Sequence, residues 1–292
     1  MNLDLLPDVI AGAIVLAGTY TLIGLSWVIV FRASQLMNFS TGQFLVLAAF
    51  AAATMIDSGW NYWLSIVIVL VGMIILGLLT YRFILRPLAG RDLFAPVVAT
   101  LGLSIVVQGI IQIAWGSQES TIKPPFANTT LQLPLGITVT VYDLIVPAVA
   151  IVAWIGVLIF LRRTKFGGQM RAANESTLLA SQSGMNVYLI FGVAFAISYV
   201  ALALSGITYG QRLVVSGSVI PLGLAGLVPA MLGGLTSIGG VALGALIVAV
   251  AQSVTVLYLG NSWSDLTVYV ILLLVLAIRP NGLLGRAEVQ RV

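Results

Sequence analysis

The sequence contains no cysteine and no histidine. Without cysteine there is no disulfide framework and no thiol chemistry. Without histidine the chain lacks the commonest general base, metal ligand and pH switch. Charge is also scarce, because Asp, Glu, Lys and Arg make up 8% of the 292 residues, against about 25% in soluble domains. So few charges exclude a soluble enzyme, a disordered tail and a nucleic-acid-binding module.

Catalytic and phosphate-binding motifs are missing as well. The sequence has no GxxxxGK[ST] phosphate loop, no HExxH zinc motif, no EF-hand loop and no Ser/His/Asp set. We therefore expect no enzymatic activity, no resident metal and no cofactor, and the chain cannot hydrolyse ATP by itself. If it performs powered work, the energy must come from a partner, and that partner needs a docking surface.

What the sequence has in abundance is apolar residues, which make up 60% of the chain and give a mean hydropathy of +1.12. Several charge-free windows reach the length of about 20 residues that a spanning helix needs. Their continuously apolar pattern favours helices over barrel strands. We predict an all-α polytopic membrane protein, a single domain over residues 1–292, with about nine crossings (eight to ten). The predicted spans are 9–31, 36–56, 61–82, 94–115, 142–161, 188–208, 215–233, 240–259 and 263–279.

The distribution of positive charge orients these spans. With the N-terminus outside, every Lys and Arg except Lys123 and Arg212 falls on the cytoplasmic side. The sequence thus predicts an N-out, C-in chain in a lipid bilayer, and the net charge of +4 reflects topology rather than a nucleic-acid partner. A re-entrant loop at 215–233 would reduce the count to eight and place both ends on one side.

Two loops are long enough to have a role. The outer loop, 116–141, is rich in proline and polar residues and is expected to form an irregular cap. The inner loop, 162–187, favours a helix over 169–182 lying at the membrane surface. The span order also suggests an inverted repeat of spans 1–4 and 6–9, as in many transporters.

Uncharged polar residues recur within the spans. Thr100, Ser104, Gln108 and Gln112 are four residues apart, which places them on one slowly drifting helix face. Such residues commonly hydrogen-bond neighbouring helices. The alternative is that they line a pathway, because a row ending in two glutamines exceeds what packing needs.

A second polar cluster begins span 2, where either Ser40 or Thr41 is suited to cap the helix. The alternative is a pathway lining, to which the seventh span would add Ser218 and Pro221. The residues of the cluster are Asn38, Ser40, Thr41 and Gln43.

Apart from charges at the ends of three spans (Arg82, Asp143, Asp265 and Arg279), the spans contain no Asp, Glu, Lys or Arg, which are the usual markers of proton or voltage coupling. Sodium coupling through carbonyl and hydroxyl oxygens stays open. A sodium-coupled secondary carrier and a passive solute channel are therefore alternatives, and both would work without partner proteins.

Four motifs, in order along the chain, resemble those of permeases in the branched-chain amino acid ABC transporter family. The chain's MNFSTGQF is similar to the family's N-F-A-H/Q-G-E-F, and RTKFG…RA to its R-T-x-F-G…R-A. Likewise SGMNV is similar to G-I-N-V, and the stretch from PLG to LGGLTSIGG to P-M-G…L-G-G-L-G-S-x-x-G. The chain's own motifs begin at Met37, Arg163, Ser183 and Pro221.

The resemblance implies one permease subunit of a bacterial inner-membrane ABC importer. Its partners would be a second permease subunit in a heterodimer, two cytoplasmic ATP-binding subunits and a periplasmic substrate-binding protein. The substrates implied are amino acids, with branched-chain ones favoured. Urea and other amides, or simple sugars carried by permeases with a similar loop, are the neighbouring alternatives.

The resemblance also makes 162–187 a cytoplasmic coupling loop for the ATPases. Departures from the family pattern remove acids: Gln43 replaces a frequent Glu, and Leu178 replaces the Glu of the broader permease loop. Arg171 and Glu175 are four apart and share a face of any helix there. The coupling residues implied are Arg163, Thr164, Phe166, Gly167, Arg171, Glu175, Ala180 and Gly184.

Overall fold

The computed structural model describes residues 6–88, 91–92, 94–125, 130–132, 138–279 and 281–285. The chain is helical there apart from two short strands. Seven helices, some trimmed or extended at their ends, are long and apolar enough to cross a membrane. They comprise α1 (Leu6–Ser34), α3 (Tyr62–Leu79), α4 (Phe94–Trp115), α5 (Val141–Arg163), α8 (Val187–Arg212), α11 (Ile238–Leu259) and α12 (Ser264–Ile278).

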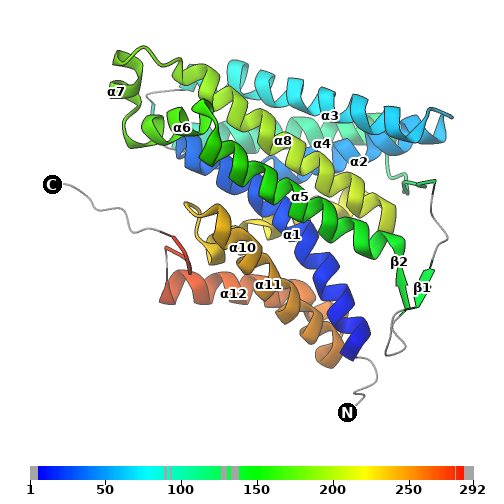
Figure 1. Ribbon diagram of the computed structural model, residues 1–292. Coiled ribbons are helices and arrows are strands. Elements are labelled where there is room, and N and C mark those ends of the chain that lie inside the picture. Colours follow the sequence, from blue (N-terminus) through cyan, green and yellow to red (C-terminus); the bar gives the residue numbers. More distant parts are fainter. Residues whose placement is uncertain are drawn as a thin grey trace.

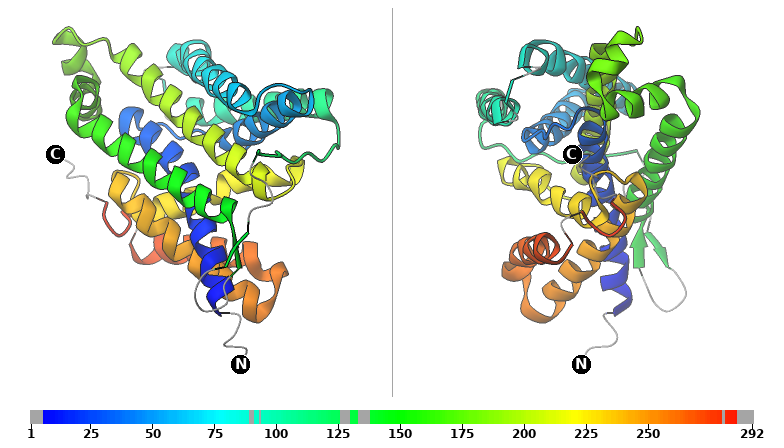
Figure 2. Two further views of the ribbon diagram at one scale, coloured as in Figure 1. Left: turned by 45° about the vertical axis from the view of Figure 1, so that its right-hand side comes forward. Right: turned by 90° about the vertical axis from the view of Figure 1, so that its left-hand side faces the viewer.

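Helices α1 and α8 form the centre of the bundle. They pack against each other, and their side chains are largely buried. Helices α3 and α4 lie on one side of this pair, and α11 and α12 lie on the other (Figure 1 and Figure 2). The outer helices expose long apolar side chains such as Ile113 and Leu273. This arrangement is typical of a bundle whose outer surface contacts lipid or another membrane subunit.

The two remaining predicted spans are short. Helix α2 (Thr41–Asp57) begins five residues later than predicted, because the preceding residues 35–40 form an irregular turn in which Gln35 has φ 58°. The seventh span is broken into a 3-10 turn (Gly217–Val219), α9 (Pro221–Ala225) and α10 (Leu227–Gly233). Pro221, which lacks a backbone N–H, begins α9, and Gly226 separates it from α10. In the described residues, seven helices are thus long enough to cross a membrane, and that α2 and the broken seventh span also cross stays a prediction.

The sequence predicts an irregular outer loop, but part of this loop is regular. Strands β1 (Thr130–Gln132) and β2 (Thr138–Thr140) form an antiparallel ladder that leads into α5. Earlier in the loop, Ser120 and Val215 exchange backbone hydrogen bonds, and Ile122 N–H donates to the carbonyl of Gly210 at 2.8 Å. These bonds fix the loop onto the end of α8, an interaction between residues too distant in sequence for local patterns to reveal.

The inner loop differs from the predicted single helix over 169–182. It folds into α6 (Lys165–Glu175) and α7 (Thr177–Gln182). Ser176 is extended and its hydroxyl caps α7 by accepting from Leu179 N–H at 3.2 Å. Thr164 caps α6 in the same way through Gly167 N–H. Two capping residues 12 positions apart divide the segment into two helices.

A glycine on each central helix faces one of the short helices. A Cβ on Gly24 of α1 would come closest to Val241 of α11, at 2.8 Å, and would lie 3.7 Å and 3.8 Å from Gly226 and Ala230. A Cβ on Gly206 of α8 would overlap the carbonyl oxygen of Leu45 and lie 3.5 Å from Ala49 of α2. The glycines are 182 positions apart, and the residues that face them are 181 apart. The central helices of the two halves therefore face the short helices at nearly the same spacing along the chain, although only the approach of α8 to α2 is tight.

Candidate translocation and coupling sites

A network of hydrogen bonds holds the turn before α2. Asn38 Oδ1 accepts hydrogen bonds from the backbone N–H of Ser40 at 3.2 Å and from its hydroxyl at 2.6 Å. From α4, Thr100 Oγ1 accepts from Phe39 N–H at 3.3 Å. Ser40 stands directly before α2, but no side chain caps the helix. The capping interpretation of this cluster is therefore wrong for Ser40, whose hydroxyl is committed to Asn38.

The same turn holds polar atoms that lack partners. Asn38, Thr41 and Gln43 are buried, with 2%, 1% and 8% of their surface exposed. Asn38 Nδ2, Thr41 Oγ1 and Gln43 Oε1 each have no hydrogen-bond partner in the structure. An unpaired buried polar group costs about 1–3 kcal/mol. The unpaired groups at the start of α2 thus lower the stability of the fold, and unsatisfied buried polar groups of this kind often mark functional sites.

The starts of α2 and α9 meet backbone to backbone. A Cβ on Gly42 would overlap the carbonyl oxygen of Ile220, and one on Gly223 would overlap the backbone of Gly42. Trp27 of α1 donates from Nε1 to the carbonyl of Gly223 at 3.0 Å and holds the crossing in place. This contact leaves no room for a solute between the two helices, so the chain is closed at this point.

The polar row on α4 divides into two parts. Thr100 and Ser104 are buried, and their hydroxyls donate to carbonyls of their own helix. Gln108 and Gln112 are exposed on the outside of the chain. The buried stripe of α4 continues through Val107 and Ile111 instead. The row therefore does not line one cavity within this chain, because a spacing of four drifts around a helix of 3.6 residues per turn.

Two of the predicted pathway residues, Ser218 and Pro221, line an open cavity of about 900 Å³ between α1, α9, α11, α12 and the end of α8. Within the cavity wall, the Tyr20 hydroxyl donates to Gln252 Oε1 at 2.8 Å. Gln252 Nε2 in turn donates to Ser264 Oγ at 2.6 Å. Tyr20, Gln252 and Ser264 are not among the pathway residues that the sequence predicts. Their signal was a lone tyrosine and a lone glutamine within apolar spans.

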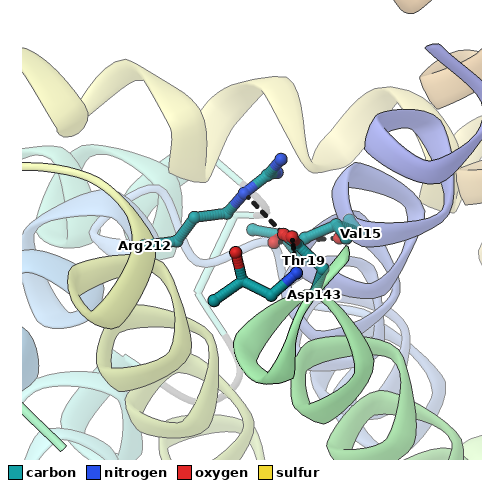
Figure 3. A network of polar contacts seen from close by, with 5 residues as sticks. Val15, Thr19, Asp143 and Arg212 are labelled. Atoms are coloured by element: carbon teal, nitrogen blue, oxygen red, sulfur yellow. Dashed lines mark hydrogen bonds and ion pairs between the residues drawn. The ribbon is translucent and has the colours of Figure 1, made fainter. Parts of the chain in front are cut away.

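Arg212, which lines this cavity, forms an ion pair with Asp143 (Figure 3). Arg212 Nε at the end of α8 lies 3.0 Å from Asp143 Oδ1 in the first turn of α5. Asp143 Oδ2 accepts from the backbone N–H of Thr140 at 3.1 Å, which completes a capping box for α5. Thr19 of α1 lies alongside and bonds back to Val15. Arg212 is thus held in one orientation by a fixed carboxylate.

The coupling residues implied by the family resemblance shape α6 and α7. Arg171 donates from its guanidinium to the carbonyl of Leu161 in the last turn of α5. Gly167 packs so closely on Leu161 that a Cβ would overlap its backbone. Ala180 is buried, and Gly184 follows α7 with φ 78°. No ion pair joins Arg171 to Glu175 among the described residues, although both lie on α6.

Other residues of the segment face outward. Arg163 and Glu175 are exposed and Phe166 is partly so. Leu178 and Leu179 of α7 are 64% and 63% exposed, which is unusual for large apolar side chains on a polar segment. Beside them a second cavity of about 650 Å³ lies between α7, α8 and the π-helical turn Thr80–Leu85. This end of the molecule offers an apolar docking surface.

Comparison with known proteins supplies the context of these sites. The family described as "Branched-chain amino acid transport system / permease component" matches residues 9–276. The high-affinity branched-chain amino acid transport system permease protein LivH of Escherichia coli strain K12 is 27% identical, covering 96% of this chain and 95% of that protein. BraD of Pseudomonas aeruginosa, a permease protein of the same description, is 25% identical and covers 97% of each.

The relatives include an archaeal protein. The probable branched-chain amino acid transport permease protein LivH of Methanocaldococcus jannaschii is 26% identical over 95% of this chain and 92% of that protein. No solved structure is significantly similar to the chain.

The match extends from α1 into α12, so it covers every helix that builds the two sites. A permease component is a subunit of a transport system, which argues against the self-sufficient sodium carrier and passive channel. The chain belongs to the family of branched-chain amino acid transport system permease components, and it is a multi-pass protein of the inner membrane.

Proposed function

We propose that this chain is one permease subunit of an ABC importer that carries amino acids, with branched-chain amino acids as the favoured substrates. The observation that carries the proposal is the close backbone contact of α2 with α9, next to an open cavity that α9 also lines, in a chain whose family is that of amino acid permeases. A transporter must have such a barrier to alternate access between two sides.

The expected topology has nine crossings, with the N-terminus outside and the C-terminus inside. Supporting this, the β1–β2 hairpin and the α6–α7 segment lie at opposite ends of the molecule in Figure 1. The nearly equal spacing of Gly24 and Gly206 and of the residues that face them supports an inverted repeat of spans 1–4 and 6–9. Inverted repeats give the two halves exchangeable outward and inward conformations.

The partners in this proposal are a second permease subunit, two cytoplasmic ATP-binding subunits and a periplasmic substrate-binding protein. ATP-driven closure of the ATPases would act on α6 and α7. Exposed Leu178 and Leu179 provide the contact, and Arg171 ties α6 to the end of α5, so that movement passes into the bundle. The contact of α2 and α9 would then open to the other side.

Uptake by the reconstituted complex tests the proposal. Proteoliposomes with both permeases, the ATPases and the binding protein should accumulate leucine only when ATP is inside. Uptake without ATP, or uptake driven by a sodium gradient, would overturn it in favour of a channel or carrier. Competition by isoleucine and valine, with none by urea or ribose, is expected if branched-chain amino acids are the substrates.

A further inference from the structure

The cavity beside α9 has the features of a ligand site rather than of a packing gap. Its volume of about 900 Å³ lies within the range of about 300–1,000 Å³ of small-molecule pockets. The polar chain from Tyr20 through Gln252 to Ser264 runs along its wall, and Tyr20 and Gln252 are more than nine-tenths buried. A buried polar chain beside an open cavity gives a ligand fixed hydrogen-bonding groups.

Two charged side chains of opposite sign line the cavity. One is Arg212, whose Nε is paired with Asp143. No hydrogen bond or ion pair in the described part of the chain uses its terminal nitrogens, and a guanidinium presents these as a fork to a carboxylate. The other is Asp265 in the first turn of α12, which has no ion-pair partner among the described residues. The lining therefore has one group for an anion and one for a cation.

The rest of the lining is mainly apolar or aromatic. Aliphatic side chains from α1, α9, α11 and α12 and the ring of Tyr269 line the walls. A ligand that combines a carboxylate, an ammonium group and an aliphatic body would use all three features of this lining. The aliphatic lining residues include Leu16, Leu222, Ala225, Val256, Leu257 and Val268.

We infer that this cavity is a transient binding site for an aliphatic amino acid in its zwitterionic form, with Arg212 receiving the carboxylate and Asp265 the ammonium group. The inference rests on the proposed function and adds a substrate site to it. The site lies within one subunit and is lined in part by α9, so movement of α9 away from Gly42 would reshape the cavity and release the ligand inward. An exposed arginine and aspartate would hold the ligand weakly, as transport requires.

Cysteine protection tests the site directly, because the natural chain has no cysteine. Ser218→Cys and Ser253→Cys place a thiol in the cavity wall, and Ser58→Cys places one on an exposed turn outside it. In the purified complex in nanodiscs, leucine should slow maleimide labelling of the two cavity thiols. At about nine times the dissociation constant the slowing should reach about tenfold, since protection follows ligand occupancy. Labelling at residue 58 should not change.

Analogues that lack one charge test the recognition chemistry. Neither 4-methylpentanoate, which lacks the ammonium group, nor isoamylamine, which lacks the carboxylate, should protect as leucine does. Asp265→Asn and Arg212→Gln should each raise the leucine concentration needed by about tenfold, the loss expected for one charge-assisted hydrogen bond. Protection that persists in both variants, or equal protection by either analogue, would overturn the inference.

Two further outcomes are informative. Protection that is present before leucine is added, and that disappears on removal of lipid, would show that a lipid occupies the cavity and would overturn the inference. If the complex takes up leucine with ATP but leucine protects neither thiol, the inferred binding site is wrong and the proposed function still holds. Absence of ATP-driven uptake would contradict the proposed function instead.

Discussion

At the residue scale, single small side chains decide whether helices can meet. Gly42 must lack a Cβ because the carbonyl of Ile220 occupies that space. We predict that Gly42→Ala forces α2 and α9 apart and destabilises the chain by about 1–3 kcal/mol, the usual cost of overpacking. The midpoint of thermal unfolding and leucine uptake should both fall. Gly102→Ala on α4, which has open space beside it, is the matched control and should change neither.

The exposed glutamines of α4 allow a second test. Gln108 is exposed and does not stabilise this chain internally, so Gln108→Leu should leave folding and complex yield unchanged. If it lines the pathway, uptake should fall by about two- to tenfold, the loss of one hydrogen bond of about 0.5–1.5 kcal/mol. Ile105→Leu on the same exposed side is the control. Normal uptake by the Gln108 variant would remove α4 from the pathway.

Arg171 has a structural contact that the sequence did not reveal. Its guanidinium bonds to the carbonyl of Leu161, so Arg171→Glu should lower the midpoint of thermal unfolding, with a cost of about 1.5–3 kcal/mol for a charged hydrogen bond. The double variant Arg171→Glu/Glu175→Arg should not recover it, because the pair makes no ion pair among the described residues. Full recovery of uptake and stability would show that the two charges interact locally after all.

At the scale of the element, substitutions in α7 can test coupling to the ATPase without changing the stability of the fold. Leu178 and Leu179 are exposed, so replacing both with serine should leave thermal stability unchanged. If α7 docks on the ATPase, the double variant should lose most of the stimulation of ATP hydrolysis by loaded binding protein. A matched change of the exposed Leu273 and Leu274 on α12 should not affect this stimulation. Unchanged stimulation in the α7 variant would place the interface elsewhere on the segment.

At the scale of the whole molecule, topology is the open prediction. Asn2 and the residues beyond 285 lie outside the described part of the chain, so internal positions are better probes. Ser58→Cys after α2 should react with an impermeant reagent in spheroplasts. Ser181→Cys on α7 should react only after permeabilisation, since α7 lies at the other end of the molecule (Figure 1). The reverse pattern would invert the proposed orientation.

The sequence by itself determined the class of protein and the positions of the long helices. Continuous apolar runs and the absence of charge decide the class and the helix positions locally. For this reason the predicted span 94–115 has the same bounds as α4. The family motifs likewise depend only on residue order.

Tertiary structure decided what no local pattern contains. The breaks before α2 and within the seventh span depend on neighbouring helices. Competing caps divide the inner loop into α6 and α7, and the packing of α6 on α5 sets the bond from Arg171 to Leu161. The cavity needed residues as distant as Tyr20 and Gln252 to meet, which packing alone brings about. Periodicity records which residues face the protein interior, but the partner that each one meets there is set by the packing of helices distant in sequence.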